Sequence, residues 1–248
     1  MLPFFKSHYS IGRSILTLED KDELDPNTPD SIVAICLKHK IKRPFLVEDS
    51  IGGFLEAYEN FSKHKINFIY GLRLTVCGDL NSKNEESRST ESKFIILMKN
   101  SKGYEDLLNL YSIAAKDGFY YYPRLDYKTL EKKWGDNLSL CVPFYDSYIF
   151  NNSFLHNICC PRINFTDATY LTEENNLIFD HLIKKKVSDL VEKEKIQKIK
   201  SIYYYKRSDF KAYLTFKCIN KRSSLDKPEL DHMSSDEFCF ESWEEANG

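Results

Sequence analysis

Short apolar segments alternate with helix-like segments through the first two-thirds of this 248-residue chain. Within the helix-like segments, apolar residues recur at steps of three and four, as Leu107, Leu110 and Ala114 do. Strands that alternate with helices predict an α/β fold with a parallel sheet, either open or closed into a barrel. The predicted strands are Pro44–Val47, Phe68–Tyr70 with Leu72–Val76, Phe94–Met98, Leu138–Val142 and Arg162–Phe165. The predicted helices are Asp30–Lys40, Phe54–His64, Gly103–Ala115 and Asp126–Trp134.

The composition sets the broad class of protein. Hydrophobic residues make up 42% of the chain, enough for one domain (1–248) with a large core and no disulfide or metal staples. A net charge of −2 lacks the basic excess of a nucleic-acid binder, so any DNA contact would need a local patch. The seven cysteines include no CxxC pair, and the N-terminus has no apolar run long enough for a signal peptide or membrane span. We therefore expect buried thiols in a soluble, cytoplasmic protein.

Two segments depart from the alternating pattern. Gly78–Ser92 is rich in Asn, Ser and Glu and is predicted to be a polar, solvated loop between two strands. From Glu173 onwards, apolar residues recur at steps of three and four among many lysines and glutamates. This pattern predicts one amphipathic helix, or a broken pair, that reaches about Lys200.

The chain contains two highly specific motifs, Asn100–Tyr104 and Gly118–Asp126, which reads GFYYYPRLD. Further motifs are Lys6–Ser10, Phe45–Asp49 followed by Gly53, Thr166–Leu171, and the tail formed by Leu225–Pro228 and Glu237–Ser242. Together these motifs resemble the PHP (polymerase and histidinol phosphatase) domain at the start of the bacterial and phage DNA polymerase III alpha subunit. The resemblance implies a distorted seven-stranded β/α barrel with metal ligands at the carboxyl ends of its strands, as is general for α/β barrels. Residues 173–208 look like a helical insertion into this pattern.

The resemblance also marks the positions at which the family binds metal. Phe4 and Lys6 stand where the family has the two histidines of its opening HxH motif. The next acid falls near Glu48 or Asp49, and the following acid is replaced by Arg73. Further along, Lys93 and Thr169 replace histidines, the ligand after the fifth strand falls near Pro143, and Asp167 is retained.

These substitutions predict a site that binds no metal and a chain that needs no cofactor. A guanidinium offers no lone pair to a cation, and a lysine ammonium offers none either. We expect Lys6, Arg73 and Lys93 to form ion pairs with the surviving carboxylates, and Asp167 to be one of the partners. His156, Cys159 and Cys160 lie close together in the sequence, but no carboxylate is placed to orient the histidine, so no nucleophile pair is predicted.

The segment after Glu173 offers a candidate contact surface. Its apolar stripe is expected to pack on the barrel, while its lysines face solvent. The alternative is that Lys184, Lys185 and Lys186, with Lys206 and Arg207, contact a polymerase partner or the DNA backbone.

The leading functional hypothesis is a catalytically silent PHP-like module of a replicative family C DNA polymerase. It would be an N-terminal or split part that scaffolds the polymerase in DNA replication and contacts its catalytic subunit or domain. No Asp-x-Asp pair lies on a predicted strand, so no nucleotidyl transfer is expected from this chain. One alternative is a metal-dependent phosphoesterase or 3′-5′ exonuclease with a rearranged site. Another is a stand-alone interaction protein of the replication machinery.

Overall fold

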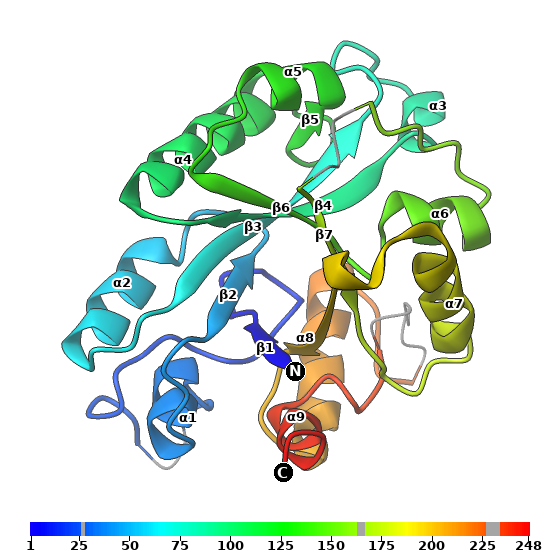
Figure 1. Ribbon diagram of the computed structural model, residues 1–248. Helices are drawn as coiled ribbons and strands as arrows, with labels where there is room; N and C mark the ends of the chain where they lie inside the picture. The colour runs from blue at the N-terminus through cyan, green and yellow to red at the C-terminus, as the bar shows by residue number, and fades with distance from the viewer. Residues whose placement is uncertain (26–27, 163–166, 227–233) are drawn as a thin grey trace. The chain divides into compact units, whose positions relative to one another are not determined.

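Strands and helices alternate along the part of the chain that the computed structural model describes, residues 1–25, 28–162, 167–226 and 234–248 (Figure 1). The predicted α/β class is therefore confirmed. Contacts divide the chain into two units that interleave in sequence. The first unit contains residues 1–70, 173–180 and 198–248, and the second contains residues 71–172 and 181–197. The strand predicted at Arg162–Phe165 falls largely outside the described residues.

The first unit is built on three parallel strands. β1 (Leu2–Phe5) lies in the centre and pairs with β2 (Phe45–Glu48) on one side and with β8 (Ile196–Ile202) on the other. Stacking of Phe4 on Phe45, with ring centroids 4.7 Å apart, supports the first pairing. β1 and β2 are mostly apolar and almost wholly buried, as expected for parallel strands covered on both faces. In β8, which has several polar residues, Ile199, Lys200 and Ile202 are buried.

Helices of the first unit follow the strands in sequence. They are α1 (Ile32–Lys38), α2 (Phe54–Lys63), the 3₁₀ turn η2 (Arg207–Asp209), α8 (Phe210–Lys221) and α9 (Phe240–Glu245). The side chain of Ser31 caps α1 by accepting from the backbone N–H groups of Val33 and Ala34.

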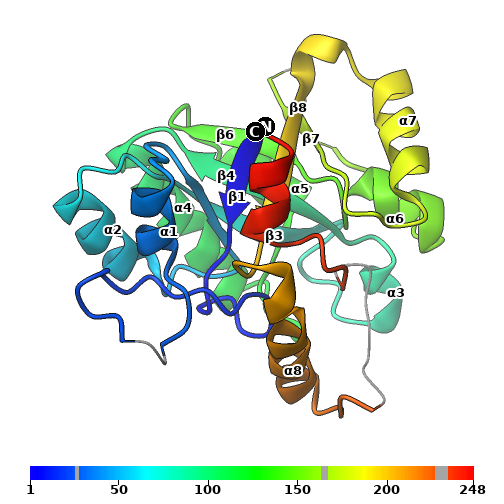
Figure 2. The ribbon, with the colours of Figure 1, turned by 90° about the horizontal axis from the view of Figure 1, so that it is seen from below.

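Helix α9 brings the two ends of the chain together in the first unit (Figure 2). The indole N–H of Trp243 donates to the carbonyl oxygen of Met1 at 3.1 Å. The terminal ammonium of Met1 in turn donates to Asn247 Oδ1 at 3.0 Å. These two bonds hold α9 beside β1.

The second unit contains a mixed sheet with the strand order β7-β6-β4-β3-β5. Its strands are β3 (Ile69–Cys77, from residue 71 on), β4 (Ser92–Met98), β5 (Arg124–Asp126), β6 (Leu138–Val142) and β7 (Thr169–Thr172). The β3–β5 and β6–β7 pairs are parallel, whereas β4 is antiparallel to both β3 and β6. The prediction of an all-parallel sheet is wrong here, because the segment that joins β3 to β4 is short and its four-residue helix α3 (Glu85–Arg88) does not form a crossover. A short connection is compatible with antiparallel pairing.

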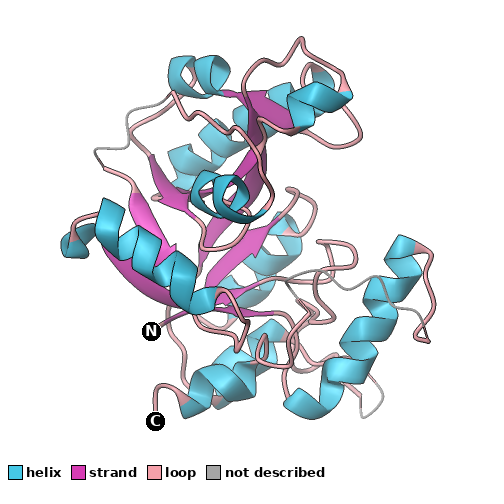
Figure 3. Cartoon of the chain, turned by 90° about the vertical axis from the view of Figure 1, so that its right-hand side faces the viewer, coloured by secondary structure: helices cyan, strands magenta, loops and turns pink. Residues whose placement is uncertain are grey.

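Helices pack alongside these strands (Figure 3). The longest, α4 (Ser101–Lys116), lies along β4 and buries Leu107, Leu110 and Ala114 as predicted. Its N-cap Asn100 accepts from the N–H of Gly103 at 3.1 Å. The others are α3 (Glu85–Arg88), α5 (Tyr127–Lys132), α6 (Tyr148–Phe154), α7 (Asp180–Leu190) and the 3₁₀ turn η1 (Lys193–Lys195). Within the described ranges, no helix has the length and apolar character needed to span a lipid bilayer.

The polar segment 78–92 is more ordered than the sequence suggests. It contains α3, whose N-cap Asn84 accepts from the N–H of Ser87 at 2.8 Å. Ser87 and Glu91 are buried. The expectation of a fully solvated loop is wrong because Arg124, distant in sequence, supplies buried charged donors to this segment.

The segment after Glu173 is only partly helical. Helix α7 ends at Leu190, and residues 196–202 form β8 instead of continuing the predicted helix. Ile199 and Ile202 face the interior of the first unit and pair with β1, which a helix could not do. The prediction of helix to Lys200 is therefore wrong at its carboxyl half.

Candidate functional site

The opening motif places a buried lysine directly after β1. Phe4 packs on Phe45, so it contributes to the core and has no atom to offer a metal. Lys6 is 3% exposed, and its ammonium lies 2.7 Å from Asp49 Oδ1. The position at which the resemblance expects a histidine ligand thus holds, in Lys6, a cation with its own carboxylate partner.

Glu48, the residue before Asp49 at the end of β2, is fully buried. Its carboxylate accepts from the N–H of Ser7 at 2.8 Å and from the hydroxyl of Ser10. The Ser10 hydroxyl also accepts from the N–H of Asp49 at 2.8 Å. Burial raises the pKa of Glu48 above its ordinary range, although Lys6 and the hydrogen bonds oppose that shift. Glu48 therefore ties the opening motif to the end of β2.

In the second unit, Arg73 likewise forms an ion pair with a carboxylate. It projects from β3, and its Nη2 lies 2.8 Å from Asp146 Oδ2 and 3.0 Å from the carbonyl oxygen of Tyr145. Asp146 has a positive φ of 58°, in the left-handed region. This turn directs the Asp146 carbonyl to the N–H of Lys93 at 2.8 Å while its carboxylate receives Arg73. The side chains of Arg73 and Asp146 are 9% and 20% exposed, so the pair is largely shielded from water.

Lys93 donates a hydrogen bond to an uncharged side chain. Its ammonium donates to Thr75 Oγ1 on the neighbouring strand at 2.6 Å and lies 5.5 Å from the ring centre of Tyr122. The residue near the next ligand position, Pro143, is buried and has no side-chain donor atom for a metal.

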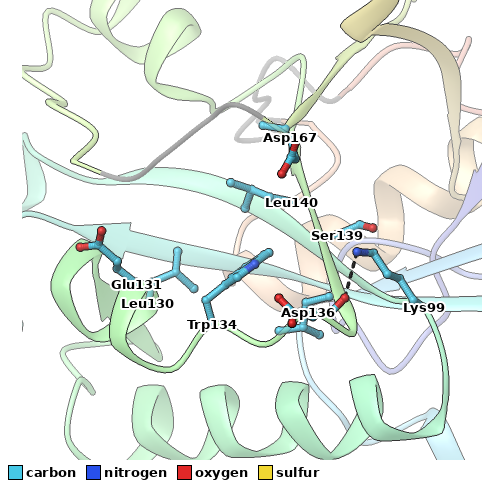
Figure 4. Close-up of a pocket in the computed structure, with 10 residues that line it drawn as sticks. Lys99, Leu130, Glu131, Trp134, Asp136, Ser139, Leu140 and Asp167 are labelled. Atoms are coloured by element: carbon cyan, nitrogen blue, oxygen red, sulfur yellow. Dashed lines mark hydrogen bonds between the residues drawn. The ribbon is translucent and has the colours of Figure 1, made fainter.

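Asp167 and Thr169 lie apart from these contacts in the second unit. Thr169 opens β7 opposite Cys141, and Asp167 is exposed at the edge of a pocket with Lys99 and Trp134 (Figure 4). Among the residues that the structure describes, the Asp167 carboxylate forms no ion pair. The structure therefore does not show the expected ion pair between Asp167 and Lys6, Arg73 or Lys93. Asp49 pairs with Lys6 instead, and Asp146 pairs with Arg73.

The sequence did not identify Asp146 as the partner of Arg73. Asp146 belongs to none of the recognised motifs, and its only signal is its place shortly after the strand β6. Across the described ranges, no group of three or more His, Cys, Asp or Glu side chains is close enough together to hold a metal ion.

The most family-specific motif has a structural role in this chain. Arg124, within GFYYYPRLD, is fully buried and lies 3.0 Å from Glu91 Oε1. It also donates to Ser87 Oγ at 3.2 Å and to the carbonyl of Gly118 at 3.3 Å. A side chain at Gly118 would clash with the carbonyl oxygen of Arg124, which explains the glycine. The motif thus joins β5 to the segment 78–92.

Cys159 is also structural. Its thiol donates to the carbonyl oxygen of Glu91 at 2.9 Å, and burial raises the pKa of the thiol to about 11. A thiol with so high a pKa is almost wholly protonated at neutral pH and is a poor nucleophile. The raised pKa argues against Cys159 as the nucleophile of a pair with His156.

The candidate contact residues divide between the two units. Lys184, Lys185 and Lys186 are exposed on α7 in the second unit, and Lys186 donates to Ser153 Oγ at 2.8 Å. Lys206 is exposed in the first unit, 5.8 Å from the ring centre of Tyr205. Arg207 differs from these lysines. It binds both carboxylate oxygens of Glu245 at 2.8 Å and Glu237 at 3.1 Å, so its guanidinium is already engaged within the first unit.

Comparison with known proteins supports the motif matches. Residues 26–180, more than half of the chain, match the PHP domain. The chain belongs to the PHP domain family. The α/β barrel class that the resemblance implied is accordingly confirmed.

Relatives of this PHP domain include the DNA polymerase III subunit alpha of three bacteria. That of Helicobacter pylori is 34% identical over 82 residues, which are 32% of this chain and 6% of the relative. That of Aquifex aeolicus is 40% identical over 63 residues, 24% of this chain and 5% of the relative. That of Chlamydia pneumoniae is 34% identical over 92 residues, 36% of this chain and 7% of the relative. The chain therefore matches only a small fraction of each relative's length.

Proposed function

We propose that this PHP domain is a catalytically silent, cytoplasmic module of a replicative family C DNA polymerase, with residues 1–248 acting as one scaffold. It would support the polymerase catalytic region, supplied either in the same polypeptide or as a separate subunit. The relatives are alpha subunits of DNA polymerase III, which supports the link to replication. All seven cysteines are free, which fits a reducing compartment.

The observation that carries the proposal is the internal neutralisation of the cations at former ligand positions. Lys6 is paired with Asp49 in the first unit, and Arg73 with Asp146 in the second. A divalent cation at either position would meet an ammonium or guanidinium at short range and would have to displace it from its carboxylate. Metal-dependent phosphoester hydrolysis needs clustered ligands that lower the pKa of a bound water, and these side chains cannot supply that chemistry.

Elemental analysis tests the absence of a metal site. The purified full chain, incubated with Zn²⁺, Mn²⁺ or Fe²⁺ and then desalted, should retain less than one equivalent of each. It should also hydrolyse neither a phosphomonoester nor the 3′ end of single-stranded DNA. The variant Arg73→Met should behave in the same way in both assays, because the proposal gives Arg73 no catalytic role. Stoichiometric metal with metal-dependent hydrolysis would instead support the phosphoesterase or exonuclease alternative.

Partner binding tests the scaffold role. We expect the chain to co-purify with the separately expressed palm and fingers of a family C polymerase. If α7 contributes, the triple variant Lys184→Ala, Lys185→Ala, Lys186→Ala should weaken this binding. The same change at three exposed lysines of α5 and its end, Lys128, Lys132 and Lys133, is the matched control. Stable folding without any polymerase binding would favour the stand-alone interaction protein.

Binding of the DNA backbone is distinguished by salt. Contact between the lysines of α7 and DNA phosphates would make the affinity for DNA fall steeply between about 50 and 200 mM salt, with each phosphate contact adding about 0.9 to the log–log slope. Binding of the polymerase through the apolar stripe of α7, which includes exposed Leu182 and Leu190, would change little over this range.

A further inference from the structure

A pocket of about 380 Å³ lies at the amino end of β6 in the second unit, and no step of the proposed function uses it. Its floor is apolar and buried, formed by Leu130, Leu138, Leu140 and Ala168. Trp134, which follows α5, forms an aromatic wall and lies between Glu131 on one side and Asp136 on the other (Figure 4). The volume falls at the lower end of the range for ligand pockets, about 300–1,000 Å³.

The pocket arises from the way the strands are aligned. β7 begins at Thr169, which pairs with Cys141, so the first residues of β6 extend beyond the start of β7. On its other side β6 remains paired with β4 over this stretch, as Met98 faces Leu138. The pocket is lined by that extended end of β6 and by Asp167 and Ala168, which precede β7.

The rim of the pocket is acidic. Glu131, Asp136 and Asp167 line it and are exposed, and within the described residues none of the three carboxylates forms an ion pair. The one cation of the lining, Lys99, donates from Nζ to the backbone carbonyl of Asp136 at 3.0 Å. In Figure 4 this bond holds Lys99 on the Asp136 side of Trp134, whereas Glu131 and Asp167 lie away from it. The formal charge of the lining side chains is thus −2, from three carboxylates and one ammonium.

We propose that this pocket receives an arginine side chain of a partner protein. The methylene stem would lie on the apolar floor, the guanidinium would stack on the face of Trp134, and Glu131 and Asp167 would accept its N–H groups. An arginine fits better than a lysine because its planar guanidinium stacks on aromatic faces, binds carboxylates with two parallel bonds, and is less strongly hydrated than an ammonium. Asp167 is also one of the positions that the resemblance assigns to metal binding, so the inference rests on the proposed absence of a metal there. Elemental analysis tests that absence separately from the peptide experiments below.

The probe for this proposal is a five-residue peptide, acetyl-Gly-Gly-Arg-Gly-Gly-amide, added to the 248-residue chain. The same peptide with citrulline has nearly the same shape but no charge, and the lysine version keeps the charge without the planar fork. The readout is the NMR resonance of the indole N–H. The sequence has two tryptophans, so Trp243 in the first unit, whose indole N–H is bound to Met1, serves as an internal control.

The arginine peptide should shift the Trp134 indole resonance in a saturable way and leave that of Trp243 unchanged. The lysine peptide should bind about two- to fivefold more weakly, because it loses the stacking and the paired hydrogen bonds. The citrulline peptide should give no saturable shift. Citrulline binding as tight as arginine binding, or lysine binding equal to arginine binding, overturns the proposal.

Variants of the rim provide a second, independent test. Asp167→Asn and Glu131→Gln should each weaken arginine-peptide binding by about two- to fivefold, the range of an exposed ion pair, and the double variant by more than either. Glu105→Gln, at an exposed carboxylate of α4 outside the pocket, should leave the affinity unchanged. Both rim residues are exposed, so the variants should fold normally. An affinity that is the same in the double variant as in the unmodified protein overturns the proposal.

Discussion

Replacing the buried Arg124 should destabilise the second unit severely. The guanidinium is 0% exposed and donates to one carboxylate, two carbonyl groups and one hydroxyl, and it lies 4.9 Å from the ring centre of Tyr120. Arg124→Met fills much of the same volume but leaves the Glu91 carboxylate, 9% exposed, with the Tyr122 hydroxyl as its remaining side-chain partner among the described residues. Removing one partner of a buried ion pair costs about 3–5 kcal/mol. That is a large share of the total stability of a domain, about 5–15 kcal/mol.

The measurement is urea unfolding followed by tryptophan fluorescence. In a Trp243→Phe background, Trp134 remains as the only tryptophan and reports on the second unit. We expect the free energy of unfolding to fall by about 4 kcal/mol in Arg124→Met. In Arg124→Met/Glu91→Gln the loss should be no larger, because the amide carries no charge that needs a partner. Additive losses from the two changes, or a loss below about 1 kcal/mol in Arg124→Met, would refute this reasoning.

Two further predictions concern stability. The pKa of Asp20 is held well below its ordinary range, mainly by the ammonium of Lys63 at 2.8 Å. The ionised carboxylate therefore stabilises the fold above pH about 4. This stabilisation is lost as the pH falls towards the lower pKa of the folded state. Asp20→Asn should therefore lower the melting temperature at pH 7 and have a much smaller effect near pH 2. An equal decrease in melting temperature at the two pH values would contradict the stabilising role given to the Asp20 carboxylate. Gly118→Ala should cost about 3 kcal/mol in the same urea assay because its methyl group would clash with the backbone carbonyl of Arg124. Gly78→Ala, whose methyl group would lie 3.5 Å from the nearest atom, is the control, and equal stability of both variants would show that the clash is relieved at no cost.

The sequence predicted the elements whose pattern is local. Helix α4 was expected at Gly103–Ala115 and is found at Ser101–Lys116, because its apolar spacing and its cap Asn100 lie within the segment itself. Strand β8 was missed because Lys200 is buried in it, where its ammonium donates to the carbonyl of Glu174 at 2.8 Å. A buried lysine disrupts the alternation of a strand, and the spacing of Ile196 and Ile199 also fits a helix.

The candidate site was predictable only in part, because some of its contacts join residues that are far apart in the sequence. The resemblance located Lys6 and Arg73 at ligand positions, and Asp49 was among the acids expected to survive nearby. The partner of Arg73 could not be read from the sequence, because Asp146 is 73 residues away and reaches it through a turn with positive φ. Contacts of this kind depend on the strand order, in which β4 lies between β3 and β6.

The pairing of Arg73 with Asp146 also restricts how this chain could change in evolution. An acidic residue at position 73 would place two carboxylates side by side in a largely buried position, with no cation between them. Like charges at such a distance raise each other's pKa and destabilise the fold until a metal binds. A functional metal cluster, however, would need several further ligands at the same time. Under the proposed metal-free function, Arg73 would therefore hinder a return to metal binding, because the first substitution would lower stability before a complete set of ligands is present.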